Sequence, residues 1–255
     1  MTDRGQTEVL GYVLVFTVIV LAIAMVTTAG QAGLIELRDN QRTANVESGF
    51  STLASNVDDV VQGGVPSRAT ELDLSGERLS LGPPITVTVQ ATDASDPSVD
   101  VFSHSRTLRP LVYHVSDGSQ LIYANGGVLA RGPHGGVAML REPEMVLSPV
   151  QTIVPITNTS LNRRQLRGSG ASIDRESRVL IRTERRTRRV LASTDRRVTL
   201  TVTVDSPRAS AWASALDRVI DPTSDDCTVN GGTAQCTYTT DRATVVATRI
   251  AVSFQ

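Results

Sequence analysis

The first eight residues of the chain carry its clearest chemical signal. They read Met1-Thr2-Asp3-Arg4-Gly5-Gln6-Thr7-Glu8 and lead directly into the apolar stretch VLGYVLVFTVIVLAIAMVTTAG. A secretory signal has its small-residue cleavage site after its apolar region, but no such site precedes the polar Glu36-Leu37-Arg38. The order of the residues instead predicts hydrolysis of the peptide bond between Gly5 and Gln6, which would leave the apolar segment at the N-terminus of the mature chain.

The apolar stretch predicts a membrane-spanning helix. No charged residue occurs from Val9 to Gly30, and about 22 residues at ~1.5 Å each extend over roughly 33 Å, which is enough for a bilayer core. Arg4 is the only cation before the stretch, and the positive-inside rule then places the N-terminus in the cytoplasm. We expect a single-pass protein of the cell membrane, with a transmembrane segment at 9–30 and an extracellular C-terminal domain.

Two residues of this region are candidates for assembly contacts. An ionisable group at a membrane edge is costly without a partner, and cleavage after Gly5 would give Gln6 a free α-amino group that could pair with Glu8 of a neighbouring copy. The alternative is that Glu8 lies in the headgroup region. Gly11 permits close approach of a second helix.

The helix is predicted to continue beyond the apolar stretch. Apolar residues recur there at spacings of four and three, which is the pattern of an amphipathic helix: Val46, Phe50, Leu53, Val57 and Val60. Gly63-Gly64-Val65-Pro66 ends the pattern, so we place the end of the helix near residue 62. The apolar side of this segment needs a partner, most simply the C-terminal domain.

The N-terminal motif resembles that of archaeal type IV pilin precursors. Arg4-Gly5-Gln6-Thr7-Glu8-Val9-Leu10-Gly11 is similar to the class III signal cut by archaeal prepilin peptidases, and the segments IYANGGVL at 122–129 and MLREP at 139–143 are similar to haloarchaeal pilin-like proteins. The resemblance implies processing at Arg4, Gly5 and Gln6 by a prepilin peptidase and assembly with other pilin subunits. Glu8 would be the third mature residue, whereas the corresponding glutamate of bacterial type IV pilins is the fifth.

Beyond Pro66 the pattern changes to strands. Apolar residues alternate with threonines at 85–91 and at 198–204, as in half-buried strands, and 243–254 closes the chain as another strand. Ser116-Asp117-Gly118-Ser119 lies between two apolar runs and indicates a hairpin.

One helix is predicted within this region, from Pro207 to about Val219, with Trp212 as a core residue. The expected fold class is α+β: a long N-terminal hydrophobic helix that forms a membrane or filament core, followed by a mostly antiparallel β domain with one short helix. The expected domains are a leader at 1–5, an N-terminal pilin helix at 6–62 and an extracellular β-rich head at 67–255.

The two cysteines, Cys227 and Cys236, flank the turn signal Asn230-Gly231-Gly232. They could therefore face each other across a hairpin, and in an exported domain a disulfide is favoured over two free thiols. Asn158-Thr159-Ser160 is an N-glycosylation sequon, so Asn158 is a candidate for modification.

Basic residues are unevenly distributed. All 25 are arginines, which fits a GC-rich genome and a halophile, although the net charge of −1 is not halophile-like. Residues 163–197 hold 12 of them against four carboxylates. The densest part is a candidate patch for surface polyanions or for another subunit, and the alternative is a solvated hairpin: Arg182, Arg185, Arg186, Arg188 and Arg189. No aromatic residue lies between them, so we do not expect nucleic acid as a partner.

We predict no catalytic, cofactor-binding or metal site, because the three histidines have neither metal-ligand spacing nor a nucleophile motif beside them. The favoured function is a pilin-like subunit of an archaeal surface filament, more specifically a minor one. Two alternatives remain: a permanently membrane-anchored receptor or surface-attachment protein of the same topology, and an exported enzyme.

Overall fold

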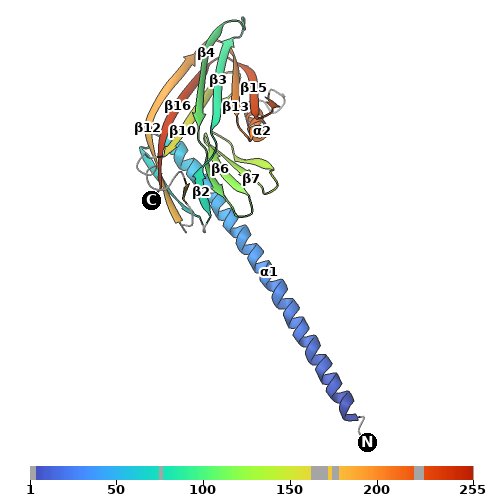
Figure 1. Ribbon diagram of the computed structural model, residues 1–255. Coiled ribbons are helices and arrows are strands. Elements are labelled where there is room, and N and C mark those ends of the chain that lie inside the picture. Colours follow the sequence, from blue (N-terminus) through green and yellow to red (C-terminus); the bar gives the residue numbers. More distant parts are fainter. Residues whose placement is uncertain (1–3, 75–76, 162–171, 174–177, 221–226, 255) are drawn as a thin grey trace. The chain divides into compact units, whose positions relative to one another are not determined.

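The computed structural model describes the chain except for residues 1–3, 75–76, 162–171, 174–177, 221–226 and 255, and the description of side chains also leaves out 4–10, 28–40, 161 and 172–173. The chain divides into two compact units, Met1–Asn45 and Val46–Gln255. The division lies inside helix α1, Arg4–Val61 (Figure 1). The last turns of α1 therefore belong to the second unit, which we call the head unit.

The head unit contains a second helix, α2, Ala209–Ile220. Its strands, in chain order, are β1 Ser67–Asp73, β2 Arg78–Leu81, β3 Ile85–Asp93, β4 Asp100–Leu108, β5 Leu111–His114, β6 Gln120–Ala124, β7 Gly127–Arg131, β8 Val137–Arg141, β9 Val146–Leu147, β10 Thr152–Leu161, β11 Ser172–Ile173, β12 Arg178–Thr194, β13 Val198–Asp205, β14 Cys227–Asn230, β15 Thr233–Thr240 and β16 Ala243–Phe254.

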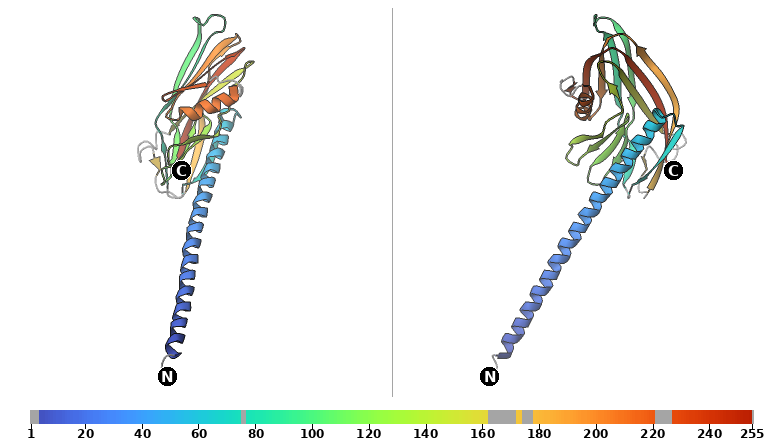
Figure 2. Two further views of the ribbon diagram at one scale, coloured as in Figure 1. Left: turned by 90° about the vertical axis from the view of Figure 1, so that its right-hand side faces the viewer. Right: turned by 180° about the vertical axis from the view of Figure 1, so that it is seen from behind.

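The strands form three sheets. Sheet A has the order β1-β12-β16-β10-β9, sheet B the order β11-β2-β5-β6-β7-β8, and sheet C the order β14-β15-β13-β3-β4. Within the described residues the pairings are antiparallel, except that β10 and β16 are parallel. Helix α2 packs on β14 and β15 (Figure 2). The sheets are therefore built largely from antiparallel neighbours, with one long-range parallel pair at the centre of sheet A.

The local patterns of the sequence account for several of these strands. β3 and β13 bury every second residue along most of their length, and these buried residues are apolar. The two strands pair antiparallel over Thr86–Asp93 and Val198–Asp205, with Val87 opposite Val204. The predicted hairpin at 116–119 joins β5 to β6, and Gly118 has a φ of 90° there, a conformation that favours glycine. These predictions are confirmed.

Two hydrophobic cores lie on the two faces of sheet B. Val112, Ile122 and Leu129 belong to the first core, together with the inner face of sheet C and with Trp212 of α2. Their neighbours along the same strands belong to the second core, with the last turns of α1: Leu111, Tyr113, Leu121, Tyr123 and Val128. Successive strand residues point to opposite faces, so this nearly continuous apolar sequence is explained by burial on both sides.

The predicted amphipathic stripe of α1 is buried in the second core. Phe50 packs edge-on against Tyr113, with 6.3 Å between the ring centroids. The other stripe residues are buried in the same core: Val46, Leu53, Val57 and Val60. The helix ends at Val61, and Gly64 follows with a φ of 77°. The prediction that the C-terminal domain covers this part of the helix is therefore confirmed.

The predicted fold class, α+β, is wrong. The described residues are mostly β, with sixteen strands in three sheets and only α1 and α2 as helices. The prediction gave too much weight to the N-terminal segment and recognised too few strands. Several strands have no clean alternation, because they are short or buried on both faces.

The prediction of a transmembrane segment at 9–30 is also corrected. A spanning helix needs roughly 20 consecutive, predominantly apolar residues. Among the residues with described side chains, no helix is long and apolar enough to cross a membrane. The expected single-pass topology, with a cytoplasmic N-terminus and an extracellular C-terminal domain, therefore has no support in the structure.

We expect Leu53→Ala to lower the free energy of unfolding by about 2–5 kcal/mol, because it opens a cavity in the second core. Leu53 is 1% exposed. Leu140→Ala is the matched control, since Leu140 is 47% exposed, and it should change stability by roughly 0.5 kcal/mol or less. Denaturant unfolding of the full chain measures both variants, and equal losses would contradict the packing of α1 into the head unit.

Candidate assembly surface and polar clusters

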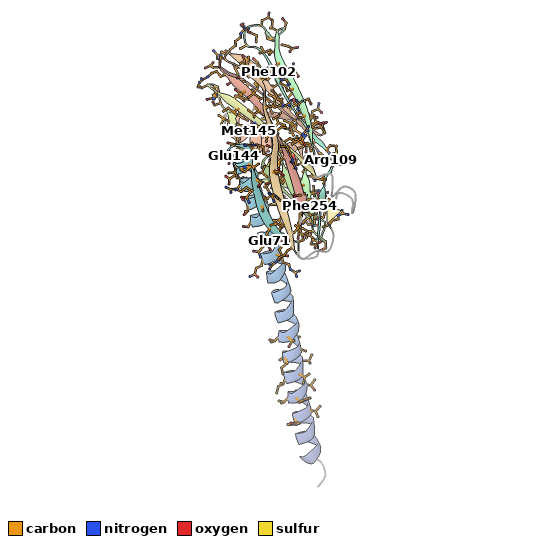
Figure 3. The ribbon with its side chains drawn as sticks, turned by 90° about the vertical axis from the view of Figure 1, so that its left-hand side faces the viewer. Glu71, Phe102, Arg109, Glu144, Met145 and Phe254 are labelled. Atoms are coloured by element: carbon orange, nitrogen blue, oxygen red, sulfur yellow. A yellow bond between two sulfur atoms is a disulfide. The ribbon has the colours of Figure 1, made fainter. Side chains whose placement is uncertain are left out.

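The first unit presents a long apolar surface. All residues from Gly11 to Thr27 are exposed, and twelve of them have large apolar side chains, with exposed fractions from 47% at Val20 to 74% at Tyr12. These twelve, which we call the apolar stretch of α1, are Tyr12, Val13, Leu14, Val15, Phe16, Val18, Ile19, Val20, Leu21, Ile23, Met25 and Val26. Their side chains extend on both sides of the helix in Figure 3.

The apolar stretch surrounds the helix and does not form a single stripe. Eleven of its twelve residues occupy eleven of the fourteen positions from Tyr12 to Met25, so every side of the helix carries apolar side chains. The hydroxyls of Thr17 and Thr27 donate back to the carbonyls of Val13 and Ile23, at 2.7 and 2.8 Å, which satisfies them within the helix. A helix that is apolar all round is normally enclosed on all sides, so one partner helix would cover only part of this surface.

The predicted processing residues lie at the edge of the description. Arg4, Gly5, Gln6 and Glu8 are part of α1, but their side chains are outside the described residues, so their roles stay predictions. Gly11 is described and exposed. A Cβ placed on Gly11 would have no atom of the chain within 4 Å, so packing within the chain does not require a glycine at this position.

A half-buried charge cluster attaches the end of α1 to β8. Arg141 Nη2 donates to Asp58 Oδ2 at 2.7 Å and lies 3.5 Å from Glu144 Oε1. Arg141 Nη1 donates to the carbonyl of Ser51 and to Ser55 Oγ. Glu144 lies between β8 and β9, next to Met145 (Figure 3). The guanidinium of Arg141 therefore contacts the carboxylates of Asp58 and Glu144, and it also donates to a carbonyl and a hydroxyl of α1.

This arrangement raises the pKa of Asp58 to about 7. Burial is the main cause and the negative charge of Glu144 adds to it, whereas Arg141 acts in the opposite direction. The neighbouring hydroxyl of Tyr123 is fully buried, and its pKa is raised by burial and then by the charge of Asp58. Two carboxylates that share one cation do not both ionise easily.

The predicted disulfide is present. Cys227 and Cys236 are directly opposite each other in the β14–β15 pair, with 4.1 Å between their Cα atoms and a sulfur–sulfur bond. Gly231 in the turn between them has a φ of 59°. The bond ties β14, at the edge of sheet C, to β15 and to the first core, in which Cys236 is fully buried.

The five arginines of the predicted patch lie on β12. Successive residues of a strand point to opposite faces, and β12 is interrupted by bulges between Arg185 and Thr187 and between Val190 and Ala192. Arg185 donates to the carbonyl of Val60 at 3.2 Å, near the C-terminus of α1, where a cation is favourable. Arg186 pairs with Glu184 at 3.2 Å.

The other three arginines of this group, Arg182, Arg188 and Arg189, are exposed. Arg189 lines an open cavity of about 220 Å³ with Arg106 and Arg249 from other strands. Binding of polyanions or of another subunit by these arginines stays a prediction.

The sequon of Asn158 lies inside β10. Asn158 Nδ2 donates to the carbonyl of Thr107 at 3.4 Å, and the hydroxyl of Ser160 donates to the carbonyl of Ile250 at 3.2 Å. The hydroxyl of Thr159 donates to the carbonyl of Arg109 at 2.8 Å, so all three side chains of the sequon are hydrogen-bonded. Modification of Asn158 stays a prediction, and we expect that it would have to precede the pairing of β10 with β16.

The charge cluster was not found from the sequence. Asp58 and Arg141 are 83 positions apart, and Arg141 stands in an ordinary alternating strand. The only local signal was that Asp58 lies beside the buried stripe of α1. The part of the chain with described side chains has no group of three or more histidines, cysteines or carboxylates arranged to hold a metal ion.

The chain belongs to a family of unknown function, DUF7289, whose family model matches residues 4–253. No curated protein and no solved structure shows a match. The match covers both compact units, so the exposed helix and the head unit are parts of one family pattern. Since the family description names no activity, the resemblance to haloarchaeal pilin-like proteins stays a prediction.

We expect the contribution of Asp58 to the free energy of unfolding to fall as the pH rises from about 4 to about 7. The fold raises its pKa from the ordinary 3.8 of an aspartate to about 7, so over this interval the folded protein retains a proton that the unfolded chain has released. Asp58→Asn should remove this part of the pH dependence.

The measurement is the free energy of unfolding at about pH 5 and about pH 8. Asp59→Asn is the matched control, because Asp59 is an exposed neighbour paired with Arg68 at 3.0 Å, and it should keep the wild-type difference. Identical pH dependence in wild type and Asp58→Asn would contradict the shifted pKa.

Proposed function

We propose that this protein is a pilin-like subunit of a surface filament, cut between Gly5 and Gln6 and assembled through the apolar stretch of α1. The observation that carries the proposal is the exposure of twelve large apolar side chains around one helix. In a filament, the helices of several copies would enclose one another, which is the arrangement that an all-round apolar surface requires.

The size of the apolar stretch supports a stable assembly. Burial of a large apolar side chain contributes about 1.5–3 kcal/mol, and these twelve are roughly half exposed or more. Enclosing them would contribute on the order of 10–20 kcal/mol per subunit before the entropy cost of association is subtracted. Gly11 adds a position at which a second helix can approach closely.

The hydrophobic cores of the head unit support the proposal, because they form without the apolar stretch of α1. Both hydrophobic cores lie within residues Val46–Gln255, so the apolar stretch contributes nothing to either core. It remains available for other copies. The disulfide between Cys227 and Cys236 is typical of proteins in an oxidising compartment, as expected for a surface filament.

The alternative of a permanently anchored receptor is not proposed, because it depends on a membrane span that the described residues do not provide. An exported enzyme has no observation in its favour. We further propose that the protein is a minor rather than a major component of its filament, because the head unit is large.

We expect Val18→Glu to abolish recovery of the protein in the sheared filament fraction of its native host, because it places a carboxylate within the enclosed apolar surface. Gln41→Glu is the matched control, since Gln41 is exposed and polar in the same unit. The melting temperature of the head unit should be the same in both variants. Normal filament recovery from Val18→Glu would contradict assembly through this surface.

We also expect the mature chain to begin at Gln6. The mass of the N-terminal peptide from cell and sheared-surface fractions measures this directly, and Gly5→Leu should leave the precursor uncut because a bulky residue replaces the small one at the cleavage site. Thr2→Ala, which lies outside the cut bond, serves as the control. A start at Met1 or Thr2 in every fraction would show that the head of the chain is not a processing signal.

A further inference from the structure

An open cavity of about 430 Å³ lies at one end of sheet B, beside the start of α2. Its polar lining comes from three strands and from the residue that precedes α2: His114 of β5, Gln120 of β6, Arg131 of β7 and Arg208. All of these residues are in the head unit. None of its lining residues belongs to the apolar stretch of α1 or to the charge cluster of Asp58.

Arg208 is the most unusual residue of this cavity. It is only 8% exposed. Its Nη2 donates to Gln120 Oε1 at 3.0 Å, whereas Nε and Nη1 are buried and have no hydrogen-bond partner. A buried charge is costly unless it is paired and hydrogen-bonded. Arg208 has two buried N–H groups without a hydrogen bond, so its burial in the structure as described is unfavourable.

The surroundings of Arg208 add positive charge. Arg131 lines the same cavity, and α2 begins at the next residue, Ala209, so the positive end of the helix dipole is also adjacent. Within the described residues, no carboxylate lies within 4.0 Å of either guanidinium. The pKa of Arg208 is lowered by burial and then by the charge of Arg131, but an arginine stays protonated in proteins.

Arg208 is held in place by a line of hydrogen bonds across sheet B. Gln120 Nε2 donates to His114 Nδ1 at 3.5 Å, which leaves the opposite ring nitrogen to donate to Ser80 Oγ at 2.9 Å. This orientation of Gln120 turns its amide oxygen to Arg208. On the other side, the backbone N–H of Arg208 donates to Ser206 Oγ at 3.1 Å. The guanidinium is therefore positioned before any ligand arrives.

The cavity also has apolar walls. Val112, Val137, Pro83 and Pro207 line it beside the two arginines. Small-molecule sites typically combine such walls with a few placed polar groups, in volumes of about 300–1,000 Å³. The charged side has room for an anion and the apolar walls for the body of a small molecule.

We propose that this cavity binds a small ligand through an oxyanion group, a phosphate, sulfate or carboxylate, held between Arg208 and Arg131. A guanidinium matches the geometry of these groups and binds them with two parallel hydrogen bonds. The negative charge of the oxyanion offsets the positive charge of the two arginines, which no described carboxylate pairs. The free ion and an acidic sugar share this chemistry.

The test is calorimetric titration of the full chain in nonionic detergent with inorganic phosphate, sulfate and glucuronate, at constant ionic strength in chloride. Glucose serves as the neutral analogue of glucuronate. We expect saturable binding of at least one anion and none of glucose. Binding of phosphate or sulfate would identify a tetrahedral anion, and binding of glucuronate alone would identify a carboxylate carried on a sugar. The absence of binding by all three anions would overturn the proposal.

Arg208→Gln and Arg131→Gln should each weaken binding by roughly tenfold or more, because each removes charge-assisted hydrogen bonds to the ligand. Arg218→Gln is the matched control, since Arg218 lies on the same helix but pairs with Glu142 at 2.7 Å, and it should bind like wild type. An equal loss in Arg218→Gln would show unspecific attraction and would overturn the site.

A second readout separates binding from folding. In anion-free buffer Arg208→Gln should melt at the same temperature as wild type or higher, because it removes an unpaired buried charge. A lower melting temperature would show that Arg208 stabilises the empty fold and would overturn the assignment. Arg131→Gln tests the same cavity without altering the buried guanidinium. These binding and melting experiments do not test filament assembly, which is tested separately with Val18→Glu.

Discussion

The burial of sheet B on both faces is the constraint on which the rest of the head unit depends. Its strands β5, β6 and β7 contribute Ile122 and Leu129 to one core and Tyr113 and Tyr123 to the other. One core holds sheet C and α2 in place, and the other holds the last turns of α1. Any change that loosens sheet B would therefore affect both cores, together with the polar groups at its edges.

Helix α1 has two segments with different surfaces. From Val46 to Val61 the helix has one apolar side, and sheets A and B cover it. From Tyr12 to Val26 it is apolar all round and exposed. One segment of the helix is thus packed in a hydrophobic core, whereas the apolar side chains of the other segment are exposed within their own unit. We assign the first segment to stability and the second to association with other copies.

Two arginines show how strongly charge placement depends on the tertiary fold. Arg141 is half buried and meets two carboxylates. Burial first and then the negative charge of Glu144 raise the pKa of Asp58 and favour its uptake of a proton. Arg208 is buried beside another arginine and meets no carboxylate in the described part of the chain. The first cluster can relieve its imbalance with a proton from solvent. The second cannot, since arginine keeps its charge, and this is the reason for proposing a bound anion there.

The sequence by itself determined the features that depend on neighbouring residues. Alternation predicted β3 and β13, the turn residues predicted the hairpin at 116–119, and the spacing of Cys227 and Cys236 around two glycines predicted the disulfide. Helical spacing predicted which side of α1 is buried from Val46 to Val60. Each of these signals extends over a few residues, so it can be recognised without knowledge of the fold.

Only the tertiary structure decided the balance of helix and strand, the parallel pairing of β10 with β16, the distribution of the β12 arginines and the cavity around Arg208. Strands buried on both faces lose the alternation that identifies them, which is why the predicted fold class was wrong. The partners of Asp58 and Arg208 lie 83 and 88 positions away along the chain. Such contacts are set by the packing of whole sheets on two cores, and no local pattern of residues records them.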